Sequence, residues 1–231
     1  MTDKVNKIEP EAKNEYLNVN YGNKPFSNYP DKLIKYLIKE TGVENNGRLL
    51  DLGCGRGEFL NSFIKSGFEG YGIDQSDIAK KHCPDAKIVV GDLEEILPFE
   101  DSFFDVVYSK SLVEHFYYPE KILREVYRIL KPGGIIITMT PNWKYVIAEF
   151  YSEFTHRTPF TKRSLQSVHE ICGFKKVKTK NFIQLPFFWK FPRLTFLVSV
   201  IRILTPKCLK NKSKLIRFSK EIMLLTTGVK N

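Results

Sequence analysis

The sequence predicts an α/β fold in which helices cover both faces of a doubly wound, mostly parallel sheet. Two observations carry this prediction. Short apolar runs that favour strands alternate with segments of helical periodicity, and such alternation builds a parallel sheet covered by helices. The run at residues 134–140 is apolar along its whole length, as a central strand buried on both faces should be.

The predicted elements follow one another in a regular order. Pro132 and Gly133 end the helix before the fifth strand, and Pro141 ends that strand. Residues 174–181 and 222–227 are candidates for a sixth and a seventh strand. The first five strands are predicted at residues 48–52, 70–73, 87–90, 104–109 and 134–140, and helices at residues 30–41, 58–66, 76–82, 119–130 and 161–172.

A loop with glycine at every second position follows the first predicted strand. Gly53, Gly55 and Gly57 have no Cβ, so the backbone can approach a ligand closely. The helix that follows directs its free N–H groups and positive dipole end toward that ligand. A dinucleotide fingerprint requires G-x-G-x-x-G, but here the third glycine comes one residue early and Glu58 follows it. The loop therefore predicts a nucleoside-type cofactor, and its spacing disfavours a dinucleotide.

Three acidic residues stand at the ends of the first three predicted strands. Asp51 lies two residues before Gly53, and Asp74 and Asp92 follow the second and third apolar runs. Because the carboxyl ends of parallel strands form the cofactor edge of such a sheet, we expect the three carboxylates to line one site. Asp51 could reach the cationic amino group of a methionine moiety, Asp74 could accept both ribose hydroxyls, and Asp92 could accept from an adenine amino group.

At this point the chain resembles the class I S-adenosylmethionine-dependent methyltransferases of the type 11 and type 12 kind. Residues 104–116 look like the family's fourth strand and the segment after it, and residues 123–134 are similar to the helix and turn before its fifth strand. The resemblance is continuous from Arg48 to Gly173. It implies a Rossmann-like sheet of seven strands, mostly parallel, with an antiparallel hairpin at one edge.

The resemblance also implies S-adenosylmethionine as cofactor and S-adenosylhomocysteine as its product. In related enzymes an N-terminal helix closes over the cofactor, which would bring Tyr16 or Tyr21 to the ligand. No metal site is expected, because the Glu114–His115 pair that binds a divalent metal in some relatives has no clear partner acids here. The implied cofactor-binding residues are Asp51, Gly53, Cys54, Gly55, Gly57, Asp74, Gln75, Asp92, Leu93, Ser109 and Tyr21.

Missing motifs narrow the methyl acceptor. After the fourth strand the chain reads Ser-Lys-Ser-Leu at residues 109–112, which is not the Asx-Pro-Pro-aromatic turn of enzymes that methylate amino groups of adenine or cytosine. It also lacks a Pro-Cys nucleophile there and a second acid near Glu114 for an arginine clamp. A hydroxyl or carboxylate oxygen remains the best acceptor. For a hydroxyl, His115 or His156 could be the general base, because imidazole titrates near pH 6.5.

Length and cysteine content predict one cytoplasmic domain. The 231 residues suit a single doubly wound domain. The four scattered cysteines suggest neither a disulfide framework nor a structural metal, and the polar first residues show no leader pattern. We expect an arm and lid helix at 1–45, a cofactor-binding core at 46–181, and a basic aromatic insertion with the last strand at 182–231.

The formal net charge of +10 is concentrated at the C-terminal end. Residues 175–231 hold 14 Lys and Arg against the single acid Glu221, which leaves 22 basic and 25 acidic residues in 1–174. This patch should recruit an anionic partner. The apolar, aromatic run at 185–204 is interrupted by Arg and Pro, and it is too short to span a bilayer, which needs about 20 apolar residues.

The preferred interpretation is an O-methyltransferase that acts on a small molecule, a sugar or glycan, or a lipid-linked acceptor. In it, residues 187–220 rest on the anionic inner face of a membrane, with Phe187, Phe188, Trp189 and Phe191 entering the interface. The residues expected to meet head groups are Lys190, Arg193, Arg202, Lys207, Lys210, Lys212, Lys214, Arg217 and Lys220.

Three alternatives stay open. The aromatic residues could instead form a substrate lid or a dimer contact, so the oligomeric state is not fixed. The basic C-terminal region could track the phosphates of RNA in an RNA methyltransferase, although nucleic acid is the less favoured partner. A non-catalytic protein that binds S-adenosylmethionine is the third alternative, and the intact set of cofactor residues argues against it.

Overall fold

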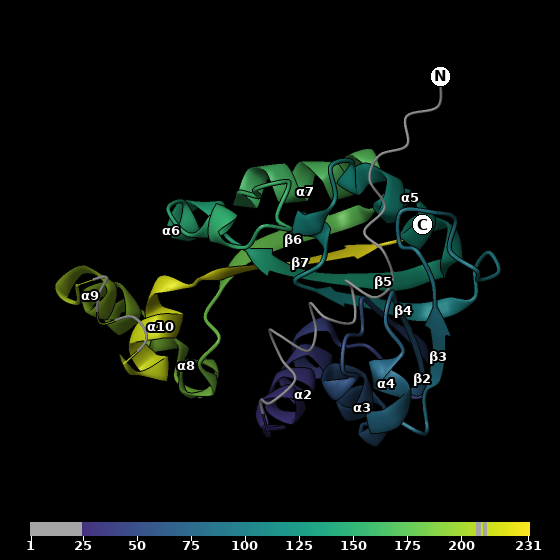
Figure 1. Cartoon of the computed structure of the whole chain (residues 1–231), viewed down its shortest axis with the longest axis horizontal. Coiled ribbons are helices and arrows are strands. Elements are labelled where there is room, and N and C mark those ends of the chain that lie inside the picture. The colour runs from purple at the N-terminus through teal and green to yellow at the C-terminus, as the bar shows by residue number, and fades with distance from the viewer. Residues whose placement is uncertain (1–24, 207–208, 210–211) are drawn as a thin grey trace.

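The computed structural model describes residues 25–206, 209 and 212–231. Its strands form one seven-stranded sheet in the order β3-β2-β1-β4-β5-β7-β6, and helices cover both faces of the sheet (Figure 1). The predicted doubly wound sheet with an antiparallel edge is therefore confirmed. Tyr16, Tyr21, Lys207, Cys208 and Lys210 lie outside the described residues.

The observed elements match the predicted ones closely. The strands are β1 (Arg48–Leu52), β2 (Glu69–Asp74), β3 (Lys87–Val90), β4 (Phe104–Lys110), β5 (Leu130–Pro141), β6 (Lys175–Phe182) and β7 (Met223–Val229). The helices are α2 (Tyr29–Thr41), α3 (Glu58–Lys65), α4 (Ile78–His82), α5 (Pro119–Ile129), α6 (Trp143–Val146), α7 (Lys162–Ile171), α8 (Pro186–Lys190), α9 (Phe196–Leu204) and α10 (Lys214–Lys220). Short 3₁₀ helices occupy Val113–His115 (η1), Phe150–Ser152 (η2) and Pro192–Thr195 (η3).

Two boundaries differ from the prediction for local reasons. Helix α4 begins at Ile78 instead of residue 76, because the Ser76 amide donates to Asp74 Oδ1 (3.1 Å) and the Ser76 hydroxyl accepts from the Ile78 amide (3.3 Å). These bonds form a turn before the helix. Strand β5 begins at Leu130 instead of residue 134, because Leu130 pairs with Phe104 ahead of a bulge in the β4–β5 ladder.

The strand order reverses beside β1. Strand β1 pairs in parallel with both β2 and β4. The chain runs from β1 outward through β2 and β3 and then returns to β4 on the other side of β1. Such a reversal opens a crevice outside the carboxyl ends of the strands. Asp51, which lies in register with Gly72 of β2 and Tyr108 of β4, stands near this point.

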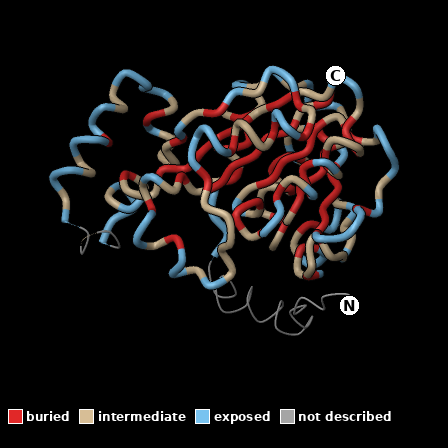
Figure 2. Tube along the Cα trace, turned by 90° about the horizontal axis from the view of Figure 1, so that it is seen from above, coloured by how far each residue is buried: buried red, intermediate tan, exposed pale blue. Residues whose placement is uncertain are grey.

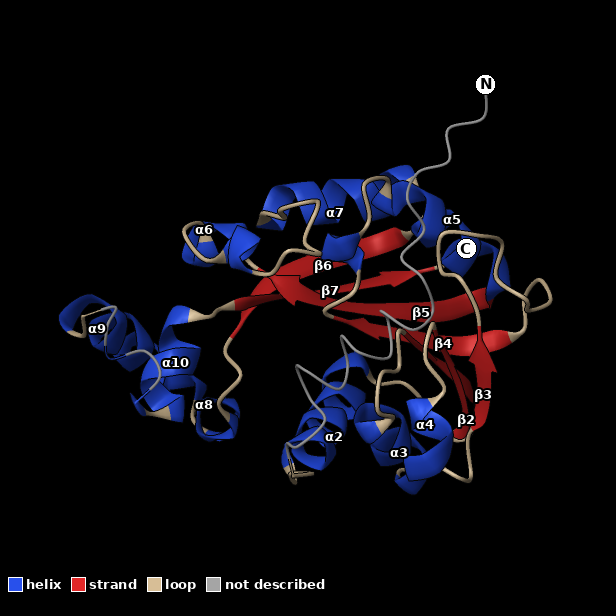
Figure 3. Ribbon diagram, in the orientation of Figure 1, coloured by secondary structure: helices blue, strands red, loops and turns tan. Residues whose placement is uncertain are grey.

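The sheet separates two apolar cores. Successive strand side chains face opposite sides of a sheet. Leu49 accordingly packs in the cluster that contains Leu33 of α2 and Phe63 of α3, whereas Leu50 packs in the cluster that contains Leu123 of α5. Figure 3 shows the strands running between these two helical layers, and Figure 2 shows that the most buried segments lie in the middle of the molecule. Burial of both faces explains why the central strands read as continuous apolar runs.

A long insertion connects β6 to β7 at the sheet edge where β5 has its carboxyl end. Strand β7 runs antiparallel between β5 and β6, with Met223 opposite both Pro141 and Phe182. Residues 183–222 therefore leave the sheet at the end of β6 and return to it at the start of β7. They carry α8, α9 and α10, and α9 and α10 project away from the sheet (Figures 1 and 3).

Helix α8 holds this insertion to the N-terminal helix. The Trp189 ring centroid lies 5.0 Å from that of Tyr36 on α2 and 5.4 Å from that of Phe182 on β6. The indole Nε1 donates to the Ile183 carbonyl (2.7 Å). Phe188 is buried in a separate small cluster. The expectation that Phe188 enters a membrane is therefore wrong, because its side chain is buried, and Trp189 is partly buried against α2 and β6 instead of projecting outward.

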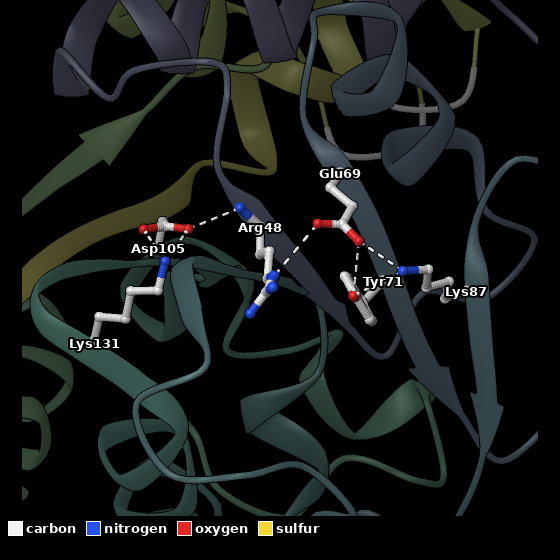
Figure 4. A network of polar contacts seen from close by, with 6 residues as sticks. All are labelled: Arg48, Glu69, Tyr71, Lys87, Asp105 and Lys131. Atoms are coloured by element: carbon white, nitrogen blue, oxygen red, sulfur yellow. Dashed lines mark hydrogen bonds and ion pairs between the residues drawn. The ribbon is translucent and has the colours of Figure 1, made fainter.

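Charged residues at the amino ends of the strands are paired with one another (Figure 4). Asp105 accepts from the Arg48 amide (2.8 Å) and from Lys131 Nζ (2.7 Å). Glu69 accepts from the Lys87 ammonium (2.6 Å) and the Tyr71 hydroxyl (2.9 Å). These pairs are largely exposed, so each contributes little to stability. They nevertheless leave the amino edge of the sheet with matched charges.

Two further findings bear on the sequence predictions. Within the described residues, no helix combines the length and the apolar character that crossing a bilayer requires. Cys54, Cys83 and Cys172 are buried free thiols.

Replacing Trp189 tests whether α8 fastens the insertion to the core. Trp189→Ala should lower the free energy of unfolding by about 2–4 kcal/mol, because the lost indole joins α8 to both α2 and β6. Phe187→Ala on the same helix, where the side chain is 53% exposed, should lower it by about 1 kcal/mol or less. Urea unfolding monitored by circular dichroism measures both changes. Equal losses in the two variants would contradict the fastening role of Trp189.

Candidate functional site

The glycine loop after β1 folds against the end of β2. The amides of Gly53 and Cys54 both donate to the Ile73 carbonyl (2.9 and 3.2 Å). Gly55 has a φ of +52°, and a Cβ added there would meet no atom of the described residues within 4 Å. Gly57, with a φ of +79°, precedes the first residue of α3. The loop thus presents bare backbone at Gly55, with open space where a side chain would stand.

Asp74 and Asp92 are oriented by neighbouring amides. Asp74 Oδ2 accepts from the Gly55 amide (2.9 Å), which fixes the carboxylate beside the loop. Asp92 Oδ1 accepts from Gln75 Nε2 (3.3 Å) and from the Glu94 amide (3.1 Å). The structure therefore brings the second and third acids of the predicted row to the same edge, with Gln75 between them.

Asp51 is buried without full hydrogen bonding. The side chain is 3% exposed, and its Oδ2 has no hydrogen-bond partner among the described residues. Burial and, to a smaller extent, the nearby Asp74 charge together raise the pKa of this carboxyl to about 8. A cation placed beside Asp51 would stabilise the ionised carboxylate. The site is therefore incomplete in a way that a positively charged ligand group would correct.

Two other buried polar atoms also lack a partner among the described residues. Ser109 Oγ on β4 and the Tyr29 hydroxyl on α2 are also buried without a partner in the described structure. Burial raises the pKa of Tyr29 above its usual range. Native proteins pair most buried polar groups, so an accumulation of unpaired ones at the carboxyl edge indicates a place where a polar ligand binds. Cys54 and Leu93, which the sequence also predicts as cofactor-binding residues, are both buried. Cys54 lies within the loop, and Leu93 packs in the second core.

Lys110 is a site residue that the sequence prediction missed. It ends β4 and lies close enough to Asp51, Glu58 and Glu114 for their charges to act on it, although burial lowers the pKa of its ammonium. Its Nζ lies 5.2 Å from the ring centroid of Phe59. The rule that identified Asp51, a charged residue at the end of an apolar strand, would also have identified Lys110.

A second group of side chains forms beyond β4. Thr140 at the end of β5 donates to Glu114 Oε2 (2.8 Å), while Glu114 Oε1 is buried without a partner in the part of the chain that the structure describes. The Glu114 carbonyl accepts from the amides of Arg157 and Thr158 (2.8 and 3.0 Å). These bonds draw the loop that contains His156 onto η1.

The two predicted catalytic histidines meet in this group. The ring centroids of His115 and His156 lie 4.8 Å apart. His156 Nδ1 donates to the Phe150 carbonyl (2.7 Å), which leaves the lone pair on Nε2. Glu114, His115 and His156 each place one ligand-type atom within 4.8 Å of the others. The sequence predicts each histidine as a candidate base but does not predict that the two rings meet, and it does not predict Glu114 as a site residue.

Burial controls the protonation of this group. Burial and, to a smaller extent, the neighbouring His156 together lower the pKa of His115 to about 4, and burial also lowers the pKa of His156. Burial raises the pKa of Glu114 to about 7. Both imidazoles are therefore neutral at pH 7 and able to accept a proton.

The other two histidines of the chain lie outside this group. His169 is fully buried, with Nε2 2.9 Å from Thr138 Oγ1 and Nδ1 2.8 Å from the Leu165 carbonyl, so it is a packing residue. His82 packs against Phe26. The predicted contact of Tyr21 with the ligand lies outside the described residues.

Known proteins resemble the chain in both sequence and fold. A family model described as a methyltransferase domain matches residues 50–138. An uncharacterized protein of Methanocaldococcus jannaschii is 31% identical over 92% of this chain and 94% of its own length. A ubiquinone biosynthesis O-methyltransferase of Alkalilimnicola ehrlichii is 28% identical, and the match covers 52% of this chain and 51% of that enzyme.

A solved structure extends the likeness to the whole fold. It is a methyltransferase in complex with the Haloferax volcanii Trm112 methyltransferase activator, with a TM-score of 0.71 at 20% identity over 96% of both chains. Sequence, fold and the acid-lined glycine loop thus agree. The chain belongs to the class I S-adenosylmethionine-dependent methyltransferases.

Proposed function

We propose that the protein transfers a methyl group from S-adenosylmethionine to an oxygen of a small molecule, a sugar or glycan, or a lipid-linked acceptor. The observation that carries the proposal is the pair of neutral histidines held beyond β4, at the same sheet edge as the acid-lined loop. A neutral imidazole can take the proton of an acceptor hydroxyl.

The residues of the loop fit the cofactor. Asp51 would meet the cationic amino group of the methionine moiety, which its buried, unpaired Oδ2 requires. Asp74 would hold the ribose hydroxyls and Asp92 the adenine amino group. The open space at Gly55 leaves room for the ligand. Cys54, Gly53, Gly57, Gln75, Leu93 and Ser109 complete the proposed cofactor-binding set.

The reaction asks mainly for alignment from the protein. The bound cofactor supplies a methyl group on a positively charged sulfur, which is already activated for displacement. The protein must hold the acceptor oxygen in line with that methyl group and exclude competing water. Where the acceptor is a hydroxyl, we propose that His115 or His156 accepts its proton at a ring nitrogen. Glu114, hydrogen-bonded to Thr140, positions the loop through its backbone carbonyl.

Two features support the acceptor class. One similar protein is named a ubiquinone biosynthesis O-methyltransferase, and the basic insertion of this chain suits an anionic membrane-proximal acceptor. An RNA methyltransferase is the second candidate, because residues 175–231 carry 14 basic residues and one acid. The proposed location is cytoplasmic, at the inner face of a membrane.

An acceptor screen tests the proposal directly. Purified protein and tritiated S-adenosylmethionine are incubated with nucleotide sugars, polyprenyl-linked glycans, lipids or bulk RNA. We expect the labelled methyl group to be bonded to an oxygen of the sugar or lipid fraction, as an ether or an ester. Label confined to RNA would replace the first proposal by the second, and S-adenosylmethionine binding without transfer to any fraction would favour the non-catalytic alternative.

Removing the ribose carboxylate should weaken cofactor binding. Asp74→Ala should raise the Kd for S-adenosylhomocysteine about 10- to 100-fold, because a charge-assisted hydrogen bond is worth roughly 1.5–3 kcal/mol. Asp105→Ala, which removes a paired carboxylate from the opposite edge of the sheet, should leave that Kd unchanged. Titration calorimetry compares the variants, and an unchanged Kd for Asp74→Ala would refute its assignment.

A side chain at Gly55 provides a matched steric test. Gly55→Val should abolish binding, because it fills the space proposed for the methionine moiety. Gly133→Val carries a similar backbone strain, since Gly133 has a φ of +80° and, within the described structure, no neighbour within 4 Å of an added Cβ, but it lies far along the chain from the loop. Binding should survive in that control.

Cofactor binding should release a proton from Asp51. With its pKa raised to about 8, the Asp51 carboxyl is mostly protonated at pH 7 in the free protein, and the cationic amino group of the ligand will lower that pKa and expel the proton. Calorimetry of S-adenosylmethionine binding in phosphate and in Tris should therefore give different enthalpies, corresponding to release of most of one proton. Asp51→Asn should bind without this buffer dependence. The same dependence in both proteins would contradict the assignment.

Loss of the true base should slow turnover without affecting cofactor affinity. His115→Ala or His156→Ala should lower kcat by ~10²–10⁴ on a hydroxyl acceptor, whereas His82→Ala should not. Wild-type turnover in both variants would exclude a histidine base and favour a carboxylate acceptor. The assay is repeated in EDTA, because loss of activity on chelation would show that Glu114 and the two histidines hold a metal ion instead.

A further inference from the structure

Helix α9 turns apolar side chains toward solvent. Phe196, Val200, Ile203 and Leu204 are spaced so that they share one face of a helix, and they are 59%, 43%, 77% and 74% exposed. Val198, on another face, is 2% exposed. A helix on the surface of a water-soluble domain normally buries its apolar face. These four residues, here called the α9 face, reverse that arrangement.

The helix is held in this orientation by its neighbours. The Lys220 ammonium on α10 donates to the carbonyls of Arg202 (3.2 Å) and Thr205 (2.7 Å) at the end of α9. The Arg202 guanidinium lies 4.7 Å from the ring centroid of Tyr145. The α9 face is therefore presented to solvent by a fixed framework.

The charge around the α9 face has one sign. The sequence contains no Asp or Glu from residue 171 to residue 220. Exposed cations flank the helix on both sides, with Lys190 and Arg193 before it and Lys212 and Lys214 after it. An apolar face bordered only by cations is complementary to a surface that offers hydrocarbon and negative charge together.

This complementarity distinguishes a lipid bilayer from other occupants. A second copy of the chain would bring its own basic border against this one, and like charges oppose each other. RNA would meet the cations but would leave three exposed aliphatic side chains without a role, since bases stack on aromatic rings and on Arg. An anionic bilayer satisfies both parts of the surface.

We propose that the α9 face inserts into the interfacial region of an anionic lipid bilayer, with the flanking cations against lipid phosphates. The insertion that carries α9 begins and ends where Phe182 and Met223 pair, beside Pro141 at the carboxyl end of β5. That is the edge at which the candidate site lies. The advantage of this arrangement rests on the proposed lipid-linked acceptor, but the binding itself does not.

Vesicle co-sedimentation of the full-length protein tests the proposal without cofactor or acceptor. The vesicles contain phosphatidylcholine alone or phosphatidylcholine with phosphatidylglycerol. Wild-type protein should sediment with the anionic vesicles, and the double variant Ile203→Ser with Leu204→Ser should bind at least about tenfold more weakly. Ile96→Ser removes an isoleucine that is 80% exposed elsewhere on the molecule, and it should bind like the wild type.

A second variant isolates the charges. Lys212→Gln with Lys214→Gln should reduce the preference for anionic vesicles, and added salt should weaken binding of the wild type. Circular dichroism and thermal unfolding confirm that each variant is folded, as expected for exposed positions. Failure of the wild type to bind anionic vesicles at low salt, or equal binding by the Ile203/Leu204 variant, would overturn the proposal.

Two other outcomes would identify a different occupant. Concentration-dependent self-association that the Ile203/Leu204 variant loses would make the α9 face a contact between copies. RNA binding that the lysine variant loses, without any vesicle binding, would make it part of a nucleic-acid surface. A negative acceptor screen together with positive vesicle binding would remove the lipid-linked acceptor but leave the α9 face as a membrane surface.

Discussion

The burial of the Asp51 carboxyl at the end of β1 is the constraint on which the site depends. Strand β1 lies beside the reversal of strand order, so Asp51 has no access to bulk water, and the nearby Asp74 opposes its ionisation. At the amino edge the arrangement is the opposite, because Asp105 is matched by Lys131 and a backbone amide. Carboxylates at the amino end of the sheet are therefore paired, whereas Asp51 Oδ2 at the carboxyl end has no hydrogen-bond partner among the described residues. A buried carboxyl without a partner favours a positively charged ligand over a neutral one.

The fold was predictable because its signals are local. Strands buried on both faces read as apolar runs, and the acids at residues 51, 74 and 92 could be grouped because strand ends share an edge in any parallel sheet. The His115–His156 pair could not be predicted in the same way, since it depends on amides of Arg157 and Thr158 that bond to the Glu114 carbonyl. Such contacts join residues some 40 positions apart without any periodic pattern.

The aromatic insertion shows a related limit of sequence analysis. Composition predicts that residues 187–191 have an affinity for an apolar environment, but it does not say which one. Trp189 finds Tyr36 and Phe182, and Phe188 finds its own cluster, whereas Phe187 and Phe191 stay exposed. For Trp189 the surroundings are provided in part by α2, a helix about 150 residues earlier in the chain. Lys180 strengthens the same junction, because its ammonium donates to the Tyr36 hydroxyl (3.2 Å) and forms an ion pair with Glu40.

The junction between α2 and α8 includes one of the unpaired polar groups. Tyr29, the first residue of α2, lies 6.0 Å from Trp189 between ring centroids, and its hydroxyl is buried without a partner among the described residues. Lys110 links Asp51 and Glu114 electrostatically, because the charges of both act on its buried ammonium. A cation brought to Asp51 would favour the ionised form of that carboxyl, so the charge near Lys110 would change while Glu114 remains a counter-charge of its ammonium. Binding of the proposed cofactor would thus change the electrostatics around Lys110 and Glu114 before any acceptor binds.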